Sequence, residues 1–162
     1  MIEAFTVQTP TGPLSVLTEA EVVVAAGFTD PETMWERLAP ARRLPMTVRP
    51  EVGAVTRAVV AYFDGQLDAF DELKIEQPGT VLQQQVWDGL RAIPAGETRT
   101  YTQLAAGTDK PAAVRAAGTA CGRNLVAPMV PCHRALRSDG TLGGYYYGLD
   151  VKRWLLTHEA TP

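Results

Sequence analysis

The hydrophobic pattern of the chain changes at Gln77-Pro78-Gly79, and this change limits what the chain can fold into. Before this point, short apolar runs are separated by turn residues, which is typical of strands. After it, apolar residues recur every three or four positions, which is typical of helices. We therefore expect an α/β N-terminal domain over residues 1–76, a linker over 77–80 and a mainly α-helical domain over 81–162. At 162 residues and 46% apolar content, the chain can bury the core this requires.

The N-terminal half reads as a scaffold without a concentration of possible catalytic groups. Its strand-like runs predict a small antiparallel meander over Ile2 to Val7, Leu14 to Thr18 and Val22 to Phe28. Asp30-Pro31 predicts the start of a helix that runs to about Leu38, because proline suits the first helical position. Val52, Val55, Val59 and Phe63 have helical spacing within a second helical segment, Pro50 to Asp64.

Three helices are expected early in the C-terminal half. The first carries the apolar stripe Leu82, Val86 and Leu90, with Trp87 beside it. Thr100-x-x-Gln103 is a capping box that predicts a second helix from Tyr101, which Gly107 ends. Pro111 predicts the start of a third helix, ending at Gly122. Two short helices joined by a glycine-containing turn indicate a helix-turn-helix, with the later one as recognition helix.

The recognition helix is unusually small in its side chains, with Arg115 alone projecting from its first turns. Such a helix can approach another surface closely, and a single long cation suits a narrow nucleic-acid groove or the space between bases. The same composition also suits tight packing inside the protein with Arg115 in solvent, and both readings stay open. Its small residues are Ala112, Ala113, Ala116, Ala117, Gly118 and Ala120.

The last part of the chain predicts a hairpin and a final helix. Ser138-Asp139-Gly140 is typical of a hairpin turn, which would give two short strands or a wing. Asp150 is expected to cap a helix whose buried face is Val151, Trp154, Leu155 and His158. Glu159 lies four residues after Leu155, so it either stays in solvent at the helix end or turns partly inward to orient a histidine.

Val130-Pro131-Cys132-His133-Arg134 is the stretch with the strongest chemical signal. A thiol is a strong nucleophile only as thiolate, and an adjacent histidine and arginine can take its proton or stabilise its anion. Pro131 would hold Cys132 in a stiff turn. Cys132 is therefore a candidate nucleophile, although a single cysteine is also often a small buried apolar residue.

Composition excludes several other kinds of protein. The chain has no apolar run near the roughly 20 residues needed to cross a bilayer and no export signal, so we expect a cytoplasmic protein. Two cysteines and two histidines without zinc-binding spacing predict no metal. Residues 1–79 hold 6 basic and 12 acidic side chains, whereas residues 80–162 hold 9 basic and 6 acidic ones. A polyanion would therefore meet the C-terminal half.

Between Thr80 and Glu159, several short motifs occur in a distinctive order and spacing. They are Gln85-Val86-Trp87, Ile93-Pro94-x-Gly96-x-Thr98, Tyr101-x-Gln103-Leu104-Ala105, Ala116-x-Gly118, Asn124, Pro131-Cys132-His133-Arg134, Gly140, Gly144-Tyr145 and Leu155-Leu156-x-x-Glu159. In these motifs the chain resembles the O6-alkylguanine-DNA alkyltransferases. The resemblance implies a winged helix-turn-helix domain that repairs DNA by irreversible, single-use transfer of an alkyl group, chiefly methyl, from O6-alkylguanine and O4-alkylthymine to Cys132.

The resemblance also implies roles for individual residues. Cys132 attacks the alkyl carbon, His133 acts as base through a water, and Glu159 orients His133. Asn124 ties the recognition helix to the active-site turn, and Tyr101 crowds the phosphate of the flipped nucleotide and donates or relays a proton to the guanine. Arg115 fills the space of the flipped base, and the remaining expected DNA contacts are Thr102, Ala116 and Arg123. The expected substrate pocket is Val130, Pro131, Tyr145, Tyr146 and Tyr147.

No cofactor is implied, since the DNA itself supplies the alkyl group, and the expected partner is double-stranded DNA with an alkylated guanine. We expect no membrane contact, no obligate protein partner and a monomer when free. Three departures from the family are Ala135-Leu136 in place of two β-branched residues, the bulky Tyr145-Tyr146-Tyr147 loop, and the lack of the zinc ligands that some relatives carry near the N-terminus. We hypothesise that these rings narrow the pocket and favour methyl over benzyl.

Three other functions compete with repair. An alkyltransferase-like binding module would recognise the lesion without a nucleophile, and the presence of Cys132 argues against it. A helix-turn-helix regulator with an incidental thiol would bind a specific sequence without taking up an alkyl group. A cysteine hydrolase needs a histidine across a cleft and an oxyanion hole, for which the sequence has no motif beyond His158.

Overall fold

The computed structural model describes residues 1–160, which form two compact units. The sheet unit holds Met1–Gln77 together with Leu125–Ala127, and the helical unit holds Pro78–Asn124 and the chain from Pro128 onward. The hydrophobic pattern predicts a single domain over all of 81–162. The segment Leu125–Ala127 departs from that division, because its backbone pairs with a strand of the sheet unit: Ala26 donates to the Leu125 carbonyl at 2.9 Å and accepts from Ala127 at 3.1 Å.

The sheet unit is built on a four-stranded mixed sheet in the order β3-β2-β1-β4. Strands β1 (Ile2–Thr9), β2 (Gly12–Glu19) and β3 (Val22–Gly27) form the predicted antiparallel meander. Strand β4 (Met46–Val48) runs parallel to β1 and was not predicted. Its three residues are too few to show a strand period, so only the pairing with β1 reveals it.

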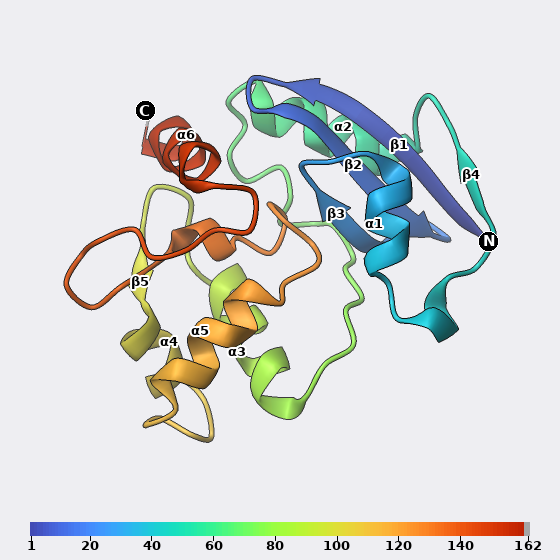
Figure 1. Cartoon of the computed structure of the whole chain (residues 1–162). Coiled ribbons are helices and arrows are strands. Elements are labelled where there is room, and N and C mark those ends of the chain that lie inside the picture. Colours follow the sequence, from blue (N-terminus) through green and yellow to red (C-terminus); the bar gives the residue numbers. More distant parts are fainter. Residues whose placement is uncertain (161–162) are drawn as a thin grey trace. The chain divides into compact units, whose positions relative to one another are not determined.

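Two helices cover this sheet, one on each side (Figure 1). Helix α1 (Pro31–Arg37) begins after Asp30, whose carboxylate accepts from the Thr33 amide at 2.8 Å, as predicted from Asp30-Pro31. A short 3-10 turn, η1 (Pro40–Arg42), follows. Helix α2 (Gly53–Phe63) contacts β1 and buries Val55, Val59 and Tyr62. Covering both faces explains why the centre of β2 is buried without alternation.

The helical unit begins with three helices that pack on one another (Figure 1). They are α3 (Val81–Arg91), α4 (Tyr101–Ala106) and α5 (Val114–Gly122). The predicted capping box of α4 is present, with the Gln103 amide donating to the Thr100 hydroxyl at 3.1 Å and the Gln103 side chain accepting from the Thr100 amide at 2.8 Å. Thr80 and Gln83 form a second such box at α3.

The rest of this unit is irregular until its last helix. The turn η2 (Cys132–Arg134) leads into β6 (Ala135–Leu136), which pairs in parallel with β5 (Arg99–Thr100). Helix α6 (Leu149–Ala160) ends the described chain. No helix within residues 1–160 is both long and apolar enough to cross a membrane.

Three local predictions for this unit were wrong. Helix α5 begins at Val114 instead of Pro111. The turn at Ser138-Asp139-Gly140 forms, with Arg137 donating to the Thr141 carbonyl at 3.0 Å, but the residues after it form no strand, and β6 pairs with β5 instead. Asp150 lies inside the first turn of α6, which begins at Leu149.

The buried face of α6 also differs from the predicted one. It consists of Lys152, Leu155 and Glu159, whereas His158 is half-buried and stacks on Trp154 with the ring centres 4.7 Å apart. The buried face includes a lysine and a glutamate, so the sequence shows no apolar stripe at these positions. The prediction therefore selected the more apolar residues one position earlier in the helix, and it was wrong.

Candidate active site

Cys132 is held at the start of a tight turn. The amide of Cys132 donates to the Val130 carbonyl at 2.8 Å, and the amide of Arg134 donates to the Pro131 carbonyl at 2.9 Å. Val130 and Pro131 are buried, whereas Cys132 is half-buried. These two bonds around Pro131 fix the backbone on both sides of the thiol. The thiol is therefore presented from a stiff support, as the proline predicted, and stays open to a partner.

Glu159 accepts hydrogen bonds from two consecutive residues of this turn. His133 Nε2 lies 2.8 Å from Glu159 Oε2, and the Arg134 guanidinium binds the same carboxylate in a two-pronged arrangement, Nε to Oε1 at 2.8 Å and Nη2 to Oε2 at 2.9 Å. Arg134 Nη1 also donates to the Ile93 carbonyl at 2.6 Å. All three side chains are buried. Helix α6 thus anchors the turn that carries Cys132 through one carboxylate.

The charges in this cluster follow from its hydrogen bonds. Burial would raise the pKa of Glu159, but hydrogen bonds from His133 and Arg134 outweigh it and hold the pKa well below its ordinary value of 4.5. Burial lowers the pKa of His133 below its ordinary value of 6.5, against the opposing effect of Glu159. We therefore assign an ionised Glu159, paired chiefly with the Arg134 cation, and a neutral His133.

This assignment fixes the tautomer of His133. An ionised carboxylate can only accept, so Nε2 carries the ring proton and donates it to Glu159. Nδ1 then holds a free lone pair. Within residues 1–160, Nδ1 is a buried atom without a hydrogen-bond partner. A neutral imidazole whose Nε2 donates to a carboxylate keeps its basic lone pair on Nδ1 and can accept a proton there.

Asn124 connects α5 to the same turn. It follows the last turn of α5, and its Nδ2 donates to the Val130 carbonyl at 2.7 Å. Both residues are buried. The Val130 carbonyl therefore accepts from Asn124 and from Cys132, so the end of α5 and the nucleophile share one anchoring atom.

Tyr101, the first residue of α4, is half-buried between two glycines. A methyl group added at Gly143 would lie 2.9 Å from the Tyr101 hydroxyl oxygen, and one added at Gly118 would lie 3.9 Å from the opposite side of the ring system, at Cδ1. Burial raises the pKa of Tyr101 to about 12, and the neighbouring Cys121 and Cys132 add to this shift. The phenol therefore keeps its proton at neutral pH and can donate it.

Helix α5 shows both features that its small side chains allow. Ala117, Ala120 and Cys121 are buried, and the Trp87 indole of α3 donates to the Ala120 carbonyl at 2.9 Å. The opposite side leaves Arg115 and Ala116 exposed. The helix thus packs tightly inside its own unit and still presents one long cation to solvent.

The other predicted DNA contacts are also at the surface. Thr102 and Arg123 are exposed, at the start of α4 and just after α5. The Thr102 hydroxyl lies 2.7 Å from the Ser138 hydroxyl, so it joins α4 to the loop after β6.

The three tyrosines of the predicted pocket contact one another. The Tyr146 and Tyr147 rings meet edge to face with centres 4.9 Å apart, and Tyr145 meets Tyr147 at 5.9 Å. Tyr145 and Tyr147 are half-buried, whereas Tyr146 is 63% exposed. Tyr146 therefore turns mainly to solvent, and the effect of these rings on alkyl size stays a prediction.

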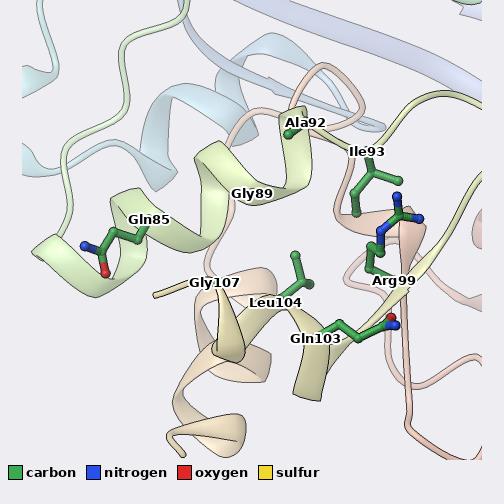
Figure 2. A pocket seen from close by; sticks show the side chains of 8 residues that line it. All are labelled: Gln85, Gly89, Ala92, Ile93, Arg99, Gln103, Leu104 and Gly107. Carbon is green, nitrogen blue, oxygen red and sulfur yellow. The ribbon is translucent and has the colours of Figure 1, made fainter. Parts of the chain in front are cut away.

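A separate hollow of about 350 Å³ lies between α3 and α4 (Figure 2). Its lining includes Arg99, Gln103 and Leu104, and Leu104 approaches α3 where Gly89 lacks a side chain. Cys132 is not among the lining residues. Within the described chain, no group of three or more histidine, cysteine or acidic side chains is arranged to hold a metal ion.

Two residues of the site were not predicted in the roles they have. Arg134 was expected to stabilise the thiolate, but its guanidinium donates hydrogen bonds to Glu159 and to the Ile93 carbonyl. Lys152 was not expected at the site at all, yet it is fully buried against the backbone on either side of the loop after β6. The roles of Arg134 and Lys152 could have been predicted only if the sequence had shown that the face of α6 with Glu159 is buried.

The helical unit defines a class of protein: a helical domain that presents a half-buried cysteine beside a histidine held by a carboxylate, together with a helix of small side chains and one exposed arginine. Residues 81–161, half of the chain, match the family described as 6-O-methylguanine DNA methyltransferase, DNA binding domain. A methylated-DNA–protein-cysteine methyltransferase of Haemophilus influenzae is 35% identical over 157 residues, which cover 94% of this chain and 83% of that protein. The chain belongs to the methylated-DNA–protein-cysteine methyltransferase family.

Further relatives agree in sequence and in fold. The corresponding methyltransferase of Methanosarcina barkeri is 50% identical over 103 residues, and the match spans 64% of this chain and 65% of that protein. The crystal structure of a variant of the Mycobacterium tuberculosis O6-methylguanine methyltransferase is 34% identical, with a TM-score of 0.84 over 99% of this chain and 94% of that one. A Mycobacterium tuberculosis OGT in complex with DNA is also 34% identical, with a TM-score of 0.83 over 98% and 92% of the two chains.

Proposed function

We propose that this protein repairs DNA by moving an alkyl group, chiefly methyl, from O6-alkylguanine to Cys132, and that it acts in the same way on O4-alkylthymine. The observation that carries the proposal is the hydrogen bond from His133 Nε2 to Glu159, which directs the Nδ1 lone pair of a buried histidine away from the carboxylate in the residue next to a half-buried thiol. The family relationship supports the same reaction, and the relatives' names state it for those proteins.

The first step is removal of the thiol proton. His133 and Cys132 are sequence neighbours, and two such side chains seldom face each other, so a water would pass the proton from Sγ to Nδ1. Glu159 stabilises the resulting imidazolium, because it already accepts from Nε2. The thiolate is then the nucleophile.

The second step is displacement at the alkyl carbon. A bond forms between Cys132 Sγ and that carbon, while the bond from the carbon to guanine O6 breaks and its electron pair stays on the base. The guanine needs a proton to leave as a neutral base, and the Tyr101 hydroxyl, which stays protonated, would donate or relay it. The product is a thioether that nothing in the chain reverses, so each molecule acts once.

The base must leave the duplex before this chemistry can occur. Flipping costs a few kcal/mol, which contacts of the protein with the vacated space and the backbone must offset. Arg115 is exposed at the first turn of α5 and would fill the space, with Thr102, Ala116 and Arg123 beside it as further DNA contacts. Helices α4 and α5 would serve as the helix-turn-helix, and the loop after β6 as its wing.

One of the related structures bears directly on partners. One solved relative is a complex with DNA, and we extend that property to this chain. The partner we propose is double-stranded DNA with an alkylated guanine, bound by a cytoplasmic monomer without a cofactor. In this proposal the predicted domain over 81–162 carries the chemistry and the domain over 1–76 is a scaffold.

The test is intact mass spectrometry after incubation with a duplex that carries one O6-methylguanine. We expect the wild-type protein to gain one methylene unit and peptide mapping to place it on Cys132. Cys132→Ser should gain nothing, whereas the matched variant Cys121→Ser should gain the same mass as wild type. The absence of any gain in wild type, or a gain that survives in Cys132→Ser, would contradict the proposal. Sequence-specific binding of undamaged DNA without mass gain would instead identify a regulator.

A further inference from the structure

Lys152 is a buried cation that the proposed chemistry does not use. It lies on α6 with no exposed surface, and its Nζ donates to the carbonyls of Ala135, at 2.7 Å, of Gly144, at 3.2 Å, and of Leu142. No carboxylate in residues 1–160 forms an ion pair with it. Burying an ammonium group is costly unless its N–H groups are satisfied. Here three carbonyls accept from the ammonium group and match its three N–H donors, although burial lowers the pKa of Lys152.

These three carbonyls belong to two segments that border the active site. Ala135 follows directly after the turn that carries Cys132 and His133. Leu142 and Gly144 flank Gly143 in the irregular loop that precedes the three tyrosines. The ammonium group therefore joins the segment that carries Cys132 to this loop. All three of its acceptors are backbone carbonyls, so the link depends on the Lys152 side chain and on no other side chain.

Gly143 lies between the two carbonyls of the loop and faces Tyr101. Its φ of +71° is in the left-handed region, and an added methyl group would lie 2.9 Å from the Tyr101 oxygen and 3.1 Å from ring carbon Cε2. The backbone at Gly143 thus packs against the Tyr101 phenol. A shift of this backbone would shift the phenol hydroxyl.

We propose that Lys152 is a positioning residue for alkyl transfer: by holding the carbonyls of Leu142 and Gly144 to that of Ala135, it keeps Gly143 against Tyr101 and sets where the phenol meets the flipped base. This inference rests on the proposed function, since it gives a position to the proton donor of that reaction. It predicts that replacing Lys152 slows methyl transfer only when the Tyr101 hydroxyl is present. If Lys152 were needed only for folding, its replacement would slow transfer equally with and without that hydroxyl.

The experiment measures the single-turnover rate constant for methyl transfer from duplex DNA in four proteins: wild type, Lys152→Met, Tyr101→Phe and the double variant. Displacement of a reacting group by about 1 Å can cost about 100-fold, so we expect Lys152→Met to slow transfer by about 10- to 100-fold. In the Tyr101→Phe background the same change should cost less than about threefold, because the hydroxyl to be positioned is gone. Lys74→Met, which removes an exposed lysine of the sheet unit, should have no effect.

Equal fold losses in both backgrounds, or no loss in either, would overturn the positioning role while wild-type transfer still supports the proposed function. No transfer by wild type would overturn both. Affinity for undamaged duplex should be unchanged in Lys152→Met, because its effect is expected on the chemical step. A parallel loss of affinity would count against the proposal.

A second pair of variants decides the matter if Lys152→Met fails to fold. Gly143→Ala places a methyl group against Tyr101, whereas Gly140→Ala imposes the same kind of backbone strain, at φ +85°, with no atom within 4 Å of the new methyl group. We expect Gly143→Ala to slow transfer at least tenfold more than Gly140→Ala, and this difference to shrink when Tyr101 is Phe. Equal rates for the two alanine variants would refute the link between this loop and Tyr101.

Discussion

The two units of the protein bury different kinds of polar residue. In the sheet unit the buried polar side chains are hydroxyls, such as Ser15 and Thr18, which donate to the carbonyls of Thr29 at 2.6 Å and Glu3 at 3.1 Å. In the helical unit they are charged or strongly polar groups around one turn: Asn124, His133, Arg134, Lys152 and Glu159. A hydroxyl on a strand is inexpensive to satisfy, whereas a buried charge needs several partners at once. The difference indicates where the chain holds atoms in place for chemistry.

Cys132 lies next to the buried polar cluster of the helical unit but is only half-buried itself. Cys132→Ser should abolish methyl transfer, because an alcohol next to a neutral histidine is far less nucleophilic than a thiol. Its free energy of unfolding should change by less than about 0.5 kcal/mol, as for substitutions away from buried networks. Rapid-quench transfer assays and urea unfolding check the two parts. A large loss of stability would mean that the thiol itself is part of the buried cluster.

Removing Glu159 should break the cluster and give the largest loss of stability. Glu159→Ala leaves Arg134 and His133 without their acceptor, and deleting one partner of a buried ion pair typically costs about 3–5 kcal/mol. Glu97→Ala is the matched control in the same unit, because its ion pair with Arg99 is solvent-exposed and such pairs contribute about 0–1 kcal/mol. Ser15→Ala in the sheet unit should cost about 1 kcal/mol. Urea unfolding that shows similar losses for all three would remove the contrast between the units.

Arg115 tests the opposite case, a charge of the helical unit that is exposed. Arg115→Ala should slow transfer from duplex DNA by about tenfold or more, because the vacated space in the stack is no longer filled and flipping costs a few kcal/mol. Reaction with free O6-methylguanine base needs no flipping and should be unchanged. The two rates, measured on the same protein, provide the check, and equal losses on both substrates would count against a role in flipping.

Acidification should weaken the helical unit first. The pKa of His133 is lowered in the folded protein, so below about 6.5 the unfolded chain binds the proton first and the unfolding free energy falls. The pKa of Glu159 is lowered as well, so its stabilising contribution, present above its ordinary value of 4.5, is lost as the pH falls further. Both shifts act in the same direction.

Urea unfolding between pH 7.5 and 4 measures this effect. Cys132→Ser should follow the wild-type profile, whereas Glu159→Ala should lose the part below about pH 4.5 that comes from the buried carboxylate. An unfolding free energy that increases as the pH falls from 7.5 to 5.5 would show that the folded protein protonates His133. His133 could then not act as the base of the proposed mechanism.

The smallest expected effect concerns alkyl size. If the tyrosine loop narrows the pocket, methyl should be transferred faster than benzyl, and replacing Tyr145 and Tyr147 with alanine should raise the benzyl rate more than the methyl rate. The exposed Tyr146→Ala is the control, since its ring is mainly in solvent. Competition between the two alkylated duplexes measures the ratio. Benzyl transfer as fast as methyl transfer by wild type would refute the idea.

The sequence predicted those parts of the fold that are set by local chemistry. Asp30-Pro31 and the Thr100–Gln103 box start helices where they were expected, because capping requires only residues within the same turn. Strand β4 and the pairing of Leu125–Ala127 were missed, because a strand so short is defined only by a distant partner.

The site was predictable in its residues and less so in its contacts. Motif spacing brought Cys132, His133 and Glu159 forward, and the structure joins His133 to Glu159 as expected. The same reasoning put Arg134 beside the thiol and left Lys152 unnoticed. Both errors arise from α6, whose buried face is polar because Lys152 and Glu159 bind other segments of the unit. In a sequence, polar residues at these positions indicate a solvent-exposed face.

The excursion of Leu125–Ala127 into the sheet unit has a consequence for anyone who would cut the chain in two. Asn124, on one side of these three residues, anchors the nucleophile turn, while Val126 pairs with Ala26 among the strands. A fragment that starts near residue 80 would therefore carry, only a few positions before Cys132, an apolar segment without the strand with which it pairs. The helical unit is therefore best studied within the full chain.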